Sequence, residues 1–288
     1  MYRLVPDIVL ILGAGVVFAA LVAGVFGRRG GRFRALPGWA LFWAGFAAVL
    51  VVLSRGPRWL AFVVLALLML GSLRAYFFVA PVRAKDRWAI LAAYAAVPLA
   101  LWPAVFGPTE RFLALVPFGL LLVLPALLSA GSVHEGLLDA TGRVLIGALC
   151  FVYCTAHLGL LIHEPTGRLE LFGCLALTVE LVQRVVGRPR PGSGTAAPLS
   201  GFLVGALLAI AAGWWLSSMA ALRPKSGAIL GLLVAMAVTA GSWVMEAIAS
   251  EFKLAPGSAR FGRGAFLDRM VSAVYAAPVF YHALPFLK

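Results

Sequence analysis

Residues 59–80 read WLAFVVLALLMLGSLRAYFFVA, a run of 22 residues with a single charged side chain, Arg74. A helix of about 20 apolar residues is long enough to cross the hydrocarbon core of a bilayer. The preceding apolar run, residues 37–53, is separated from it only by the short stretch Ser54–Arg58, which reads SRGPR. The glycine and proline in this stretch favour a tight turn. These two runs therefore predict a pair of membrane helices joined by a turn.

Similar apolar runs recur along the whole chain. Of its 288 residues, 62% are hydrophobic and only 12% are charged, whereas soluble domains carry about 25% charged residues. We predict an all-α fold, a polytopic transmembrane helical bundle of about ten spans. The predicted spans are residues 7–26, 37–53, 59–80, 88–106, 111–130, 144–163, 168–187, 201–220, 227–249 and 266–286.

The runs leave no room for a soluble domain of useful size. We divide one membrane domain into N-terminal helices, residues 1–160, and C-terminal helices, residues 161–288, which carry the candidate site. The main charge cluster follows the first run, the reverse of a cleavable signal peptide, so residues 7–26 are expected to be retained as a span. The three cysteines all lie inside apolar runs and give no disulfide framework.

The basic residues indicate an orientation. The formal net charge is +13, with 24 Lys and Arg residues. If the N-terminus lies outside the cell membrane, 16 of these 24 residues fall in loops on the cytoplasmic side, as the positive-inside rule requires. The 16 are Arg28, Arg29, Arg32, Arg34, Arg74, Arg83, Lys85, Arg87, Arg143, Arg184, Arg188, Arg190, Lys253, Arg260, Arg263 and Arg269. We expect a bacterial inner (cytoplasmic) membrane protein. Because topology and anionic headgroups explain these charges, we expect no nucleic-acid partner.

Four polar residues near the C-terminus form the strongest chemical signal. Glu246, Ser250 and Lys253 are spaced to share one face of the ninth predicted helix, near its cytoplasmic end. Asp268 begins the last helix after a glycine-containing loop. Two carboxylates brought together there would suit Mg²⁺ and a phosphate. The structural alternative is that Glu246 pairs with a cation and that Asp268 caps the last helix.

Two other groups are less specific. Arg184, Arg188 and Arg190 at the end of the seventh span would either hold a phosphate or anchor the helix at the headgroups, and Glu180 is spaced to pair with Arg184. Cys150, Cys154 and His157 share a helical face, which suits either small apolar packing or, less well, a metal.

The C-terminal part resembles the phosphatidate cytidylyltransferase (CDP-diacylglycerol synthase) family. The matching residues are Ser250 and Lys253 at a helix end, Leu267-Asp268-Arg269, and the run Ser272–Phe280. Glu246 stands where the family carries an Asp. The resemblance covers about residues 168–284. It departs from the family at residues 194–201, GTAAPLSG, where two lysines and an acid are missing, and at Leu254 and Val271, where the family has Arg and Asp.

The resemblance implies transfer of a cytidylyl group from CTP to phosphatidate or a related lipid phosphate. It implies catalytic roles for Asp268, Glu246 and Lys253, with Mg²⁺ held by Glu246 and Asp268. It also implies that the substrate is bound by Ser250, Arg269, Arg263, Arg184 and Arg188. The implied partners are membrane lipids, CTP and, in a homodimer, a second copy of the chain. The missing lysines favour an alternative, an inactive paralogue that binds lipid or regulates a partner. A transporter is the third reading, disfavoured by the few intramembrane charges and the lack of an inverted repeat.

Overall fold

The computed structural model describes residues 36–83, 87–130, 136–165, 167–186, 196–251 and 263–287, and these residues contain helices and no strands. The all-α prediction is confirmed for them. The first predicted span, residues 7–26, lies outside the described residues. The α-helices are α2 (Leu36–Arg55), α3 (Arg58–Val79), α4 (Arg87–Val105), α5 (Thr109–Phe118), α6 (Leu124–Ser129), α7 (Leu137–Ala148), α8 (Thr155–Leu161), α9 (Arg168–Val185), α10 (Ala196–Leu216), α11 (Pro224–Glu251) and α12 (Arg263–Leu287).

Three short segments of other helix types complete the fold. The π-helical segments η3 (Gly119–Val123) and η4 (Leu149–Cys154) join α5 to α6 and α7 to α8, so each pair forms one continuous rod. The 3₁₀ segment η5 (Ser217–Ala220) ends α10 before the turn to α11. A π-helical turn interrupts the regular hydrogen-bond ladder of an α-helix and is often found beside functional residues.

Six described helical segments are long and apolar enough to cross a membrane, which is compatible with an integral membrane protein. The count of about ten spans is not confirmed. The six are Arg58–Val79, Arg87–Val105, Thr109–Ser129, Leu137–Leu161, Leu199–Ala220 and Pro224–Ile248, and two shorter apolar helices are Phe42–Arg55 and Val274–Leu287. Large apolar side chains on their outer faces, such as Leu99 and Trp215, are exposed as lipid contact requires.

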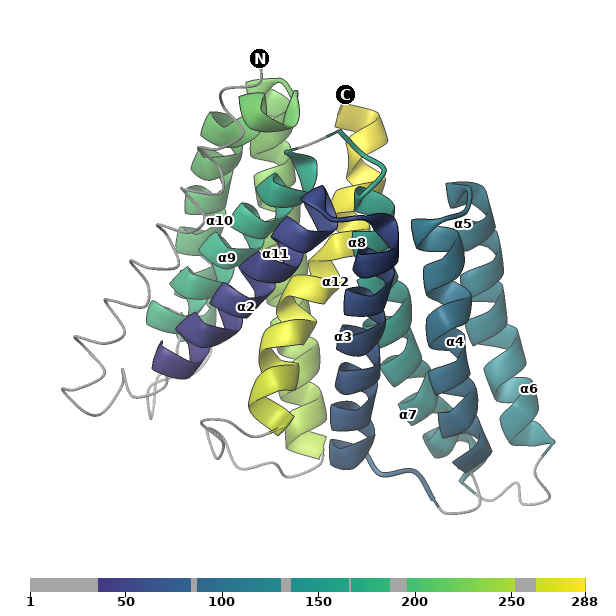
Figure 1. Cartoon of the computed structure of the whole chain (residues 1–288). Helices are drawn as coiled ribbons and strands as arrows, with labels where there is room; N and C mark the ends of the chain where they lie inside the picture. The colour runs from purple at the N-terminus through teal and green to yellow at the C-terminus, as the bar shows by residue number, and fades with distance from the viewer. Residues whose placement is uncertain are drawn as a thin grey trace.

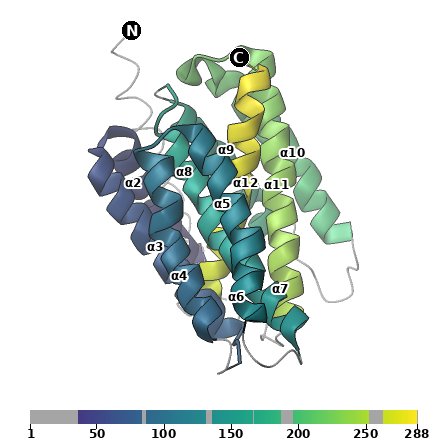
Figure 2. The same cartoon turned by 90° about the vertical axis from the view of Figure 1, so that its right-hand side faces the viewer.

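The helices form one bundle with α10 and α11 on one side and α4, α5 and α6 on the other (Figures 1 and 2). Two ends can be defined in the orientation of Figure 1. The upper end holds the α8–α9 turn, the α10–α11 turn and the end of α12. The lower end holds the end of α3, the start of α7, the end of α11 and the start of α12.

Helix α9 lies in the interior, although it carries more charge than its neighbours. Phe172 and Leu175 are fully buried, and so are most residues along its length. Phe172 contacts Phe280 of α12, with ring centroids 5.5 Å apart. The prediction placed a span at residues 168–187. The helix is there, but the buried Arg168, Glu170 and Glu180 make it a polar helix enclosed by apolar ones.

Helices α10 and α11 approach each other through small residues. A Cβ atom added to Gly213 would overlap the carbonyl oxygen of Gly227, and one added to Gly231 would overlap that of Ala209. Backbone contact of this kind is typical of helix pairs in membranes, where small residues allow close packing. The result is a tightly joined hairpin that leads directly into the lower-end segment carrying Glu246.

Candidate functional site

The α11–α12 hairpin fixes the depth of the two predicted metal ligands. Glu246 lies five positions before Glu251, the last residue of α11, and Asp268 lies five positions after Arg263, the first residue of α12. At 1.5 Å per residue, each backbone position is about 7.5 Å from its helix end. The two helices run side by side in opposite directions (Figures 1 and 2). Glu246 and Asp268 therefore occupy similar depths at the lower end.

The α11 side of the site is open. The side chains of Glu246 and Ser250 are exposed, while Met245 on the adjacent face is 4% exposed and packs into the core. The spacing of Glu246 and Ser250 puts them on one helical face, as the sequence predicted. Lys253 lies outside the described residues, so its predicted catalytic role stays a prediction.

On the α12 side, Arg263, Asp268 and Arg269 all belong to the first two turns of the helix. Their side chains lie outside the described part of the structure, and the substrate-binding and metal-binding roles predicted for them stay predictions. What the backbone establishes is that a helix begins at Arg263 and carries Asp268 beside the last turns of α11.

Helix α9 ends before it reaches the level of Glu246 in the bundle. Gln183 donates a hydrogen bond from Nε2 to Oγ1 of Thr239 at 2.6 Å, which sets the register between α9 and α11. Glu246 is seven residues beyond Thr239, or about 10 Å further along α11. The backbone of Arg184 is thus about 10 Å from the level of Glu246 along the axis. Arg188 and the side chain of Arg184 lie outside the described part of the structure, so the substrate-binding roles predicted for them stay predictions.

Glu180 adds a carboxylate that the sequence suggested only as an ion-pair partner of Arg184. It is 3% exposed, in the lower part of α9. An ionisable side chain inside a membrane bundle is costly and usually marks either a satisfied polar contact or a functional cavity. Glu180 makes an interaction in the structure, so it is not left without a partner.

The carboxylates suit Mg²⁺ better than the cysteines suit any metal. Within the described ranges, no three His, Cys, Asp or Glu side chains are grouped closely enough to hold an ion, so Cys150, Cys154 and His157 do not form the metal site considered from their spacing. Mg²⁺ usually takes one or two carboxylates and completes its shell with water and substrate phosphates. The Mg²⁺ site predicted on Glu246 and Asp268 stays a prediction, because the side chain of Asp268 lies outside the described part of the structure.

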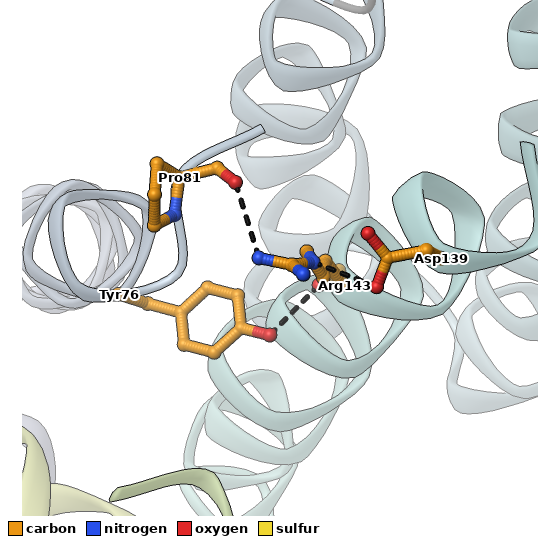
Figure 3. Close-up of polar contacts among 4 residues, drawn as sticks. All are labelled: Tyr76, Pro81, Asp139 and Arg143. Atoms are coloured by element: carbon orange, nitrogen blue, oxygen red, sulfur yellow. Dashed lines mark hydrogen bonds and ion pairs between the residues drawn. The ribbon is translucent and has the colours of Figure 1, made fainter. Parts of the chain in front are cut away.

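A polar cluster at the lower end was not found from the sequence (Figure 3). Arg143 of α7 donates from Nε to Oδ1 of Asp139 at 2.9 Å and from Nη1 to the Pro81 carbonyl at 3.4 Å. The Tyr76 hydroxyl of α3 donates to the Arg143 carbonyl at 2.9 Å. The Asp139–Arg143 spacing was the available signal. The cluster fastens the end of α3 to the start of α7.

The upper end holds a second, more enclosed cluster. Arg168 donates from Nη1 to Glu164 and from Nε to the carbonyl of Ala220 in the α10–α11 turn, the latter at 3.4 Å. Gly167, at φ +99°, donates its backbone N–H to Glu170 at 3.0 Å. A Cβ atom at Gly167 would overlap the Met219 carbonyl, so only glycine fits. These contacts fasten the α8–α9 turn to the α10–α11 turn.

Comparison with known proteins finds a distant relative. The chain is 26% identical over 259 residues to "Uncharacterized protein YnbB" of Escherichia coli (strain K12), covering 83% of this chain and 84% of that protein. No family model matches the chain, and no solved structure matches it. The similarity extends over most of both chains.

Proposed function

We propose that the protein is a membrane lipid nucleotidyltransferase of the phosphatidate cytidylyltransferase type. The observation that carries the proposal is the position of Glu246 and Asp268. Two carboxylate-bearing residues that are 22 positions apart in the sequence lie at matching depth on two adjacent antiparallel helices. They do so within the segment whose sequence resembles that family.

The placement suits a reaction between a lipid and a water-soluble nucleotide. Both positions are about 7.5 Å from the helix ends, which is near the headgroup level for helices that end at the membrane surface. Glu246 and Ser250 are exposed at this end, so a substrate can reach them. A lipid phosphate and the triphosphate of CTP would meet here, and nowhere deeper in the bundle.

In the proposed reaction, an oxygen of the lipid phosphate attacks the α-phosphorus of CTP. A new P–O bond forms, the bond between the α-phosphorus and the bridging oxygen breaks, and pyrophosphate leaves. Glu246 and Asp268 would hold Mg²⁺, which would supply charge neutralisation and orientation of the phosphates. Ser250, Lys253 and Arg269 would bind phosphate oxygens, with Arg263, Arg184 and Arg188 contributing positive charge around the nucleotide.

The test is pyrophosphate release from CTP by the purified protein in detergent or nanodiscs, with phosphatidate and Mg²⁺. We expect release that requires all three components and that yields a CDP-linked lipid. Asp268→Asn keeps the shape of the side chain and removes its charge, and should abolish release. Release no higher than from an unrelated membrane protein would contradict the proposal.

The second candidate is a non-catalytic relative on the same scaffold, which binds a lipid phosphate or a partner protein. Residues 194–201 favour it, because GTAAPLSG contains none of the cations expected beside a triphosphate. This candidate predicts binding of phosphatidate vesicles without CTP turnover. The same preparation distinguishes the two, since lipid binding is measured independently of pyrophosphate release.

A further inference from the structure

Helix α3 carries one charged residue inside its apolar run. Arg74 lies five positions before the helix ends at Val79. At 1.5 Å per residue, its backbone is about 7.5 Å from the lower end of the helix. Its side chain is exposed, whereas Leu73 and Ala75 on either side of it are buried. Ionisable residues within membrane helices usually face the bundle interior, so an arginine that faces outward has to find its counter-charge outside the bundle.

The neighbouring helix α4 brings a hydroxyl group to the same place. Phe77 of α3 and the half-buried Tyr94 of α4 have ring centroids 6.2 Å apart, which sets the register of the two helices. Arg74 is three positions before Phe77, or about 4.5 Å along the axis. It is close enough to the Tyr94 hydroxyl to interact with it electrostatically. A guanidinium and a phenol therefore lie together where α3 packs against α4, a region that we call the α3–α4 seam.

The described part of the chain leaves both groups without a polar partner. Among the described residues, neither Arg74 nor the Tyr94 hydroxyl forms a hydrogen bond or an ion pair. The helices α3 and α4 contain no acidic residue, and Asp139 of α7 is engaged by Arg143. Positive charge accumulates around the lower end of the seam instead. Against a single acid, Asp86, the sequence from residue 74 to residue 87 contains Arg74, Arg83, Lys85 and Arg87.

A lipid phosphate matches what the α3–α4 seam presents. The guanidinium offers five N–H donors in a planar fork that fits phosphate oxygens, and the phenol adds one O–H donor. Arginines near a helix end reach the headgroup level with their long side chains. The exposed aromatic residues Phe78 and Trp88 lie beside this level, as is typical of the membrane–water interface. The anion that can reach an outward-facing group here is the headgroup of a bilayer lipid.

We propose that the α3–α4 seam binds an anionic phospholipid of the bilayer through its headgroup phosphate. Arg74 and Tyr94 hold the phosphate, and Arg87 adds positive charge at the start of α4. The lipid joins α3 to α4. It is separate from the proposed nucleotidyl transfer, because α4 and the helix that carries Glu246, α11, lie on opposite sides of the bundle (Figures 1 and 2). This lipid is a bound component of the protein and is not consumed.

The experiment counts the lipid that the full chain retains in mixed micelles with phosphatidylglycerol or phosphatidylcholine, by native mass spectrometry. Phosphatidylglycerol is anionic, and its phosphodiester is not a substrate of the proposed transfer, so binding is measured independently of pyrophosphate release. We expect one retained phosphatidylglycerol per chain and a higher thermal midpoint than with phosphatidylcholine. Arg74→Gln should weaken retention about fivefold or more, the factor for one arginine at an anionic lipid surface. Tyr94→Phe should cause a smaller loss.

Arg58→Gln is the matched control. Arg58 is exposed on the same helix but at its opposite end, and this variant should retain phosphatidylglycerol like the unsubstituted chain. Because Arg74 is exposed, Arg74→Gln should keep the thermal midpoint of the unsubstituted chain in phosphatidylcholine, which separates lost binding from misfolding. Equal retention by Arg74→Gln and the unsubstituted chain, or an equal loss in Arg58→Gln, would overturn the proposal. Equal stabilisation by inorganic phosphate would also overturn it, since the ligand would then be a free anion.

Discussion

At the upper end, Arg168 is 5% exposed and its partners are Glu164 and the Ala220 carbonyl, whereas at the lower end Arg143 and Asp139 keep 26% and 63% of their side-chain surface. Both are pairs of residues four positions apart, but Glu164 lies in the α8–α9 turn whereas Asp139 and Arg143 share α7. The upper-end pair joins the α8–α9 turn to the α10–α11 turn. The lower-end pair joins α3 to α7 and remains accessible to solvent or headgroups.

This difference indicates that the two ends of the bundle have different roles. Buried ion pairs are strongly destabilising when one partner is removed, while exposed pairs contribute little. The exposed Glu246 and Ser250 also lie at the lower end. We infer that stability depends more on the upper end and that the proposed chemistry depends on the lower end, and the predictions below test this separation.

The largest effect is expected on activity, from Glu246→Ala. If Glu246 holds the metal, the rate of pyrophosphate release should fall about 10²-fold or more, the scale found when one charge-stabilising group is removed from an active site. Because Glu246 is exposed, the free energy of unfolding should change by less than about 0.5 kcal/mol. Both quantities can be measured on one preparation.

Glu251→Ala is the control for this substitution. Glu251 is also exposed and ends the same helix, but five positions along α11 it points to a different face. It should retain activity. Equal losses in the two variants would mean that general negative charge at the lower end matters, and not a site built on Glu246.

The largest effect on stability is expected from Arg168→Ala. It removes the guanidinium group that contacts Glu164 and the Ala220 carbonyl in an enclosed turn. We expect a loss of roughly 3 kcal/mol, at the lower end of the range for buried pairs because Glu164 retains 17% exposure. Unfolding in mixed micelles measures it. The double variant Arg168→Ala/Glu164→Ala should be more stable than Arg168→Ala, since the partly buried carboxylate that lost its contact with the guanidinium group is removed as well.

The fold was largely predictable because apolar run length is a strong signal. The helices α3, α4, α10 and α11 fall where residues 59–80, 88–106, 201–220 and 227–249 predicted them. The run length did not reveal that α9 would be enclosed by its neighbours. A run that contains Arg168, Glu170 and Glu180 is compatible with either a span or an interior helix, and only packing decides between them.

The candidate site was predictable only along single helices. The common face of Glu246 and Ser250 follows from helical spacing, and so does the Asp139–Arg143 pair. Contacts between residues on different helices leave no regular spacing in the sequence from which they could be predicted. The spacing of Cys150, Cys154 and His157 suggested a metal ligand set on one helix, yet the partner of His157 is His282, 125 residues away.

A moderate effect is expected from Gly213→Ala, near the upper end of α10. The added methyl group would meet the backbone of Gly227 in α11, which cannot move independently of its helix. Forcing the helices apart should cost about 1–3 kcal/mol. Gly205→Ala is the control on the same helix, because its Cβ would lie 3.6 Å from Val179 in ordinary contact. That variant should be neutral or slightly stabilised, and equal losses would show that the close contact is not what holds the hairpin.

The smallest effect is expected from Asp139→Asn at the lower end. The substitution keeps the shape of the side chain and removes one charge from an exposed pair, which should cost only about 0.2–1 kcal/mol and less at high salt. Tyr76→Phe in the same cluster is the useful reference. It removes one 2.9 Å hydrogen bond from a ring that is 1% exposed, and should cost about 1 kcal/mol at any salt concentration. If Asp139→Asn instead costs as much as Arg168→Ala, the lower-end pair is enclosed in the working protein. A bound lipid or a second chain would then have to cover it, and the contrast between the two ends would disappear.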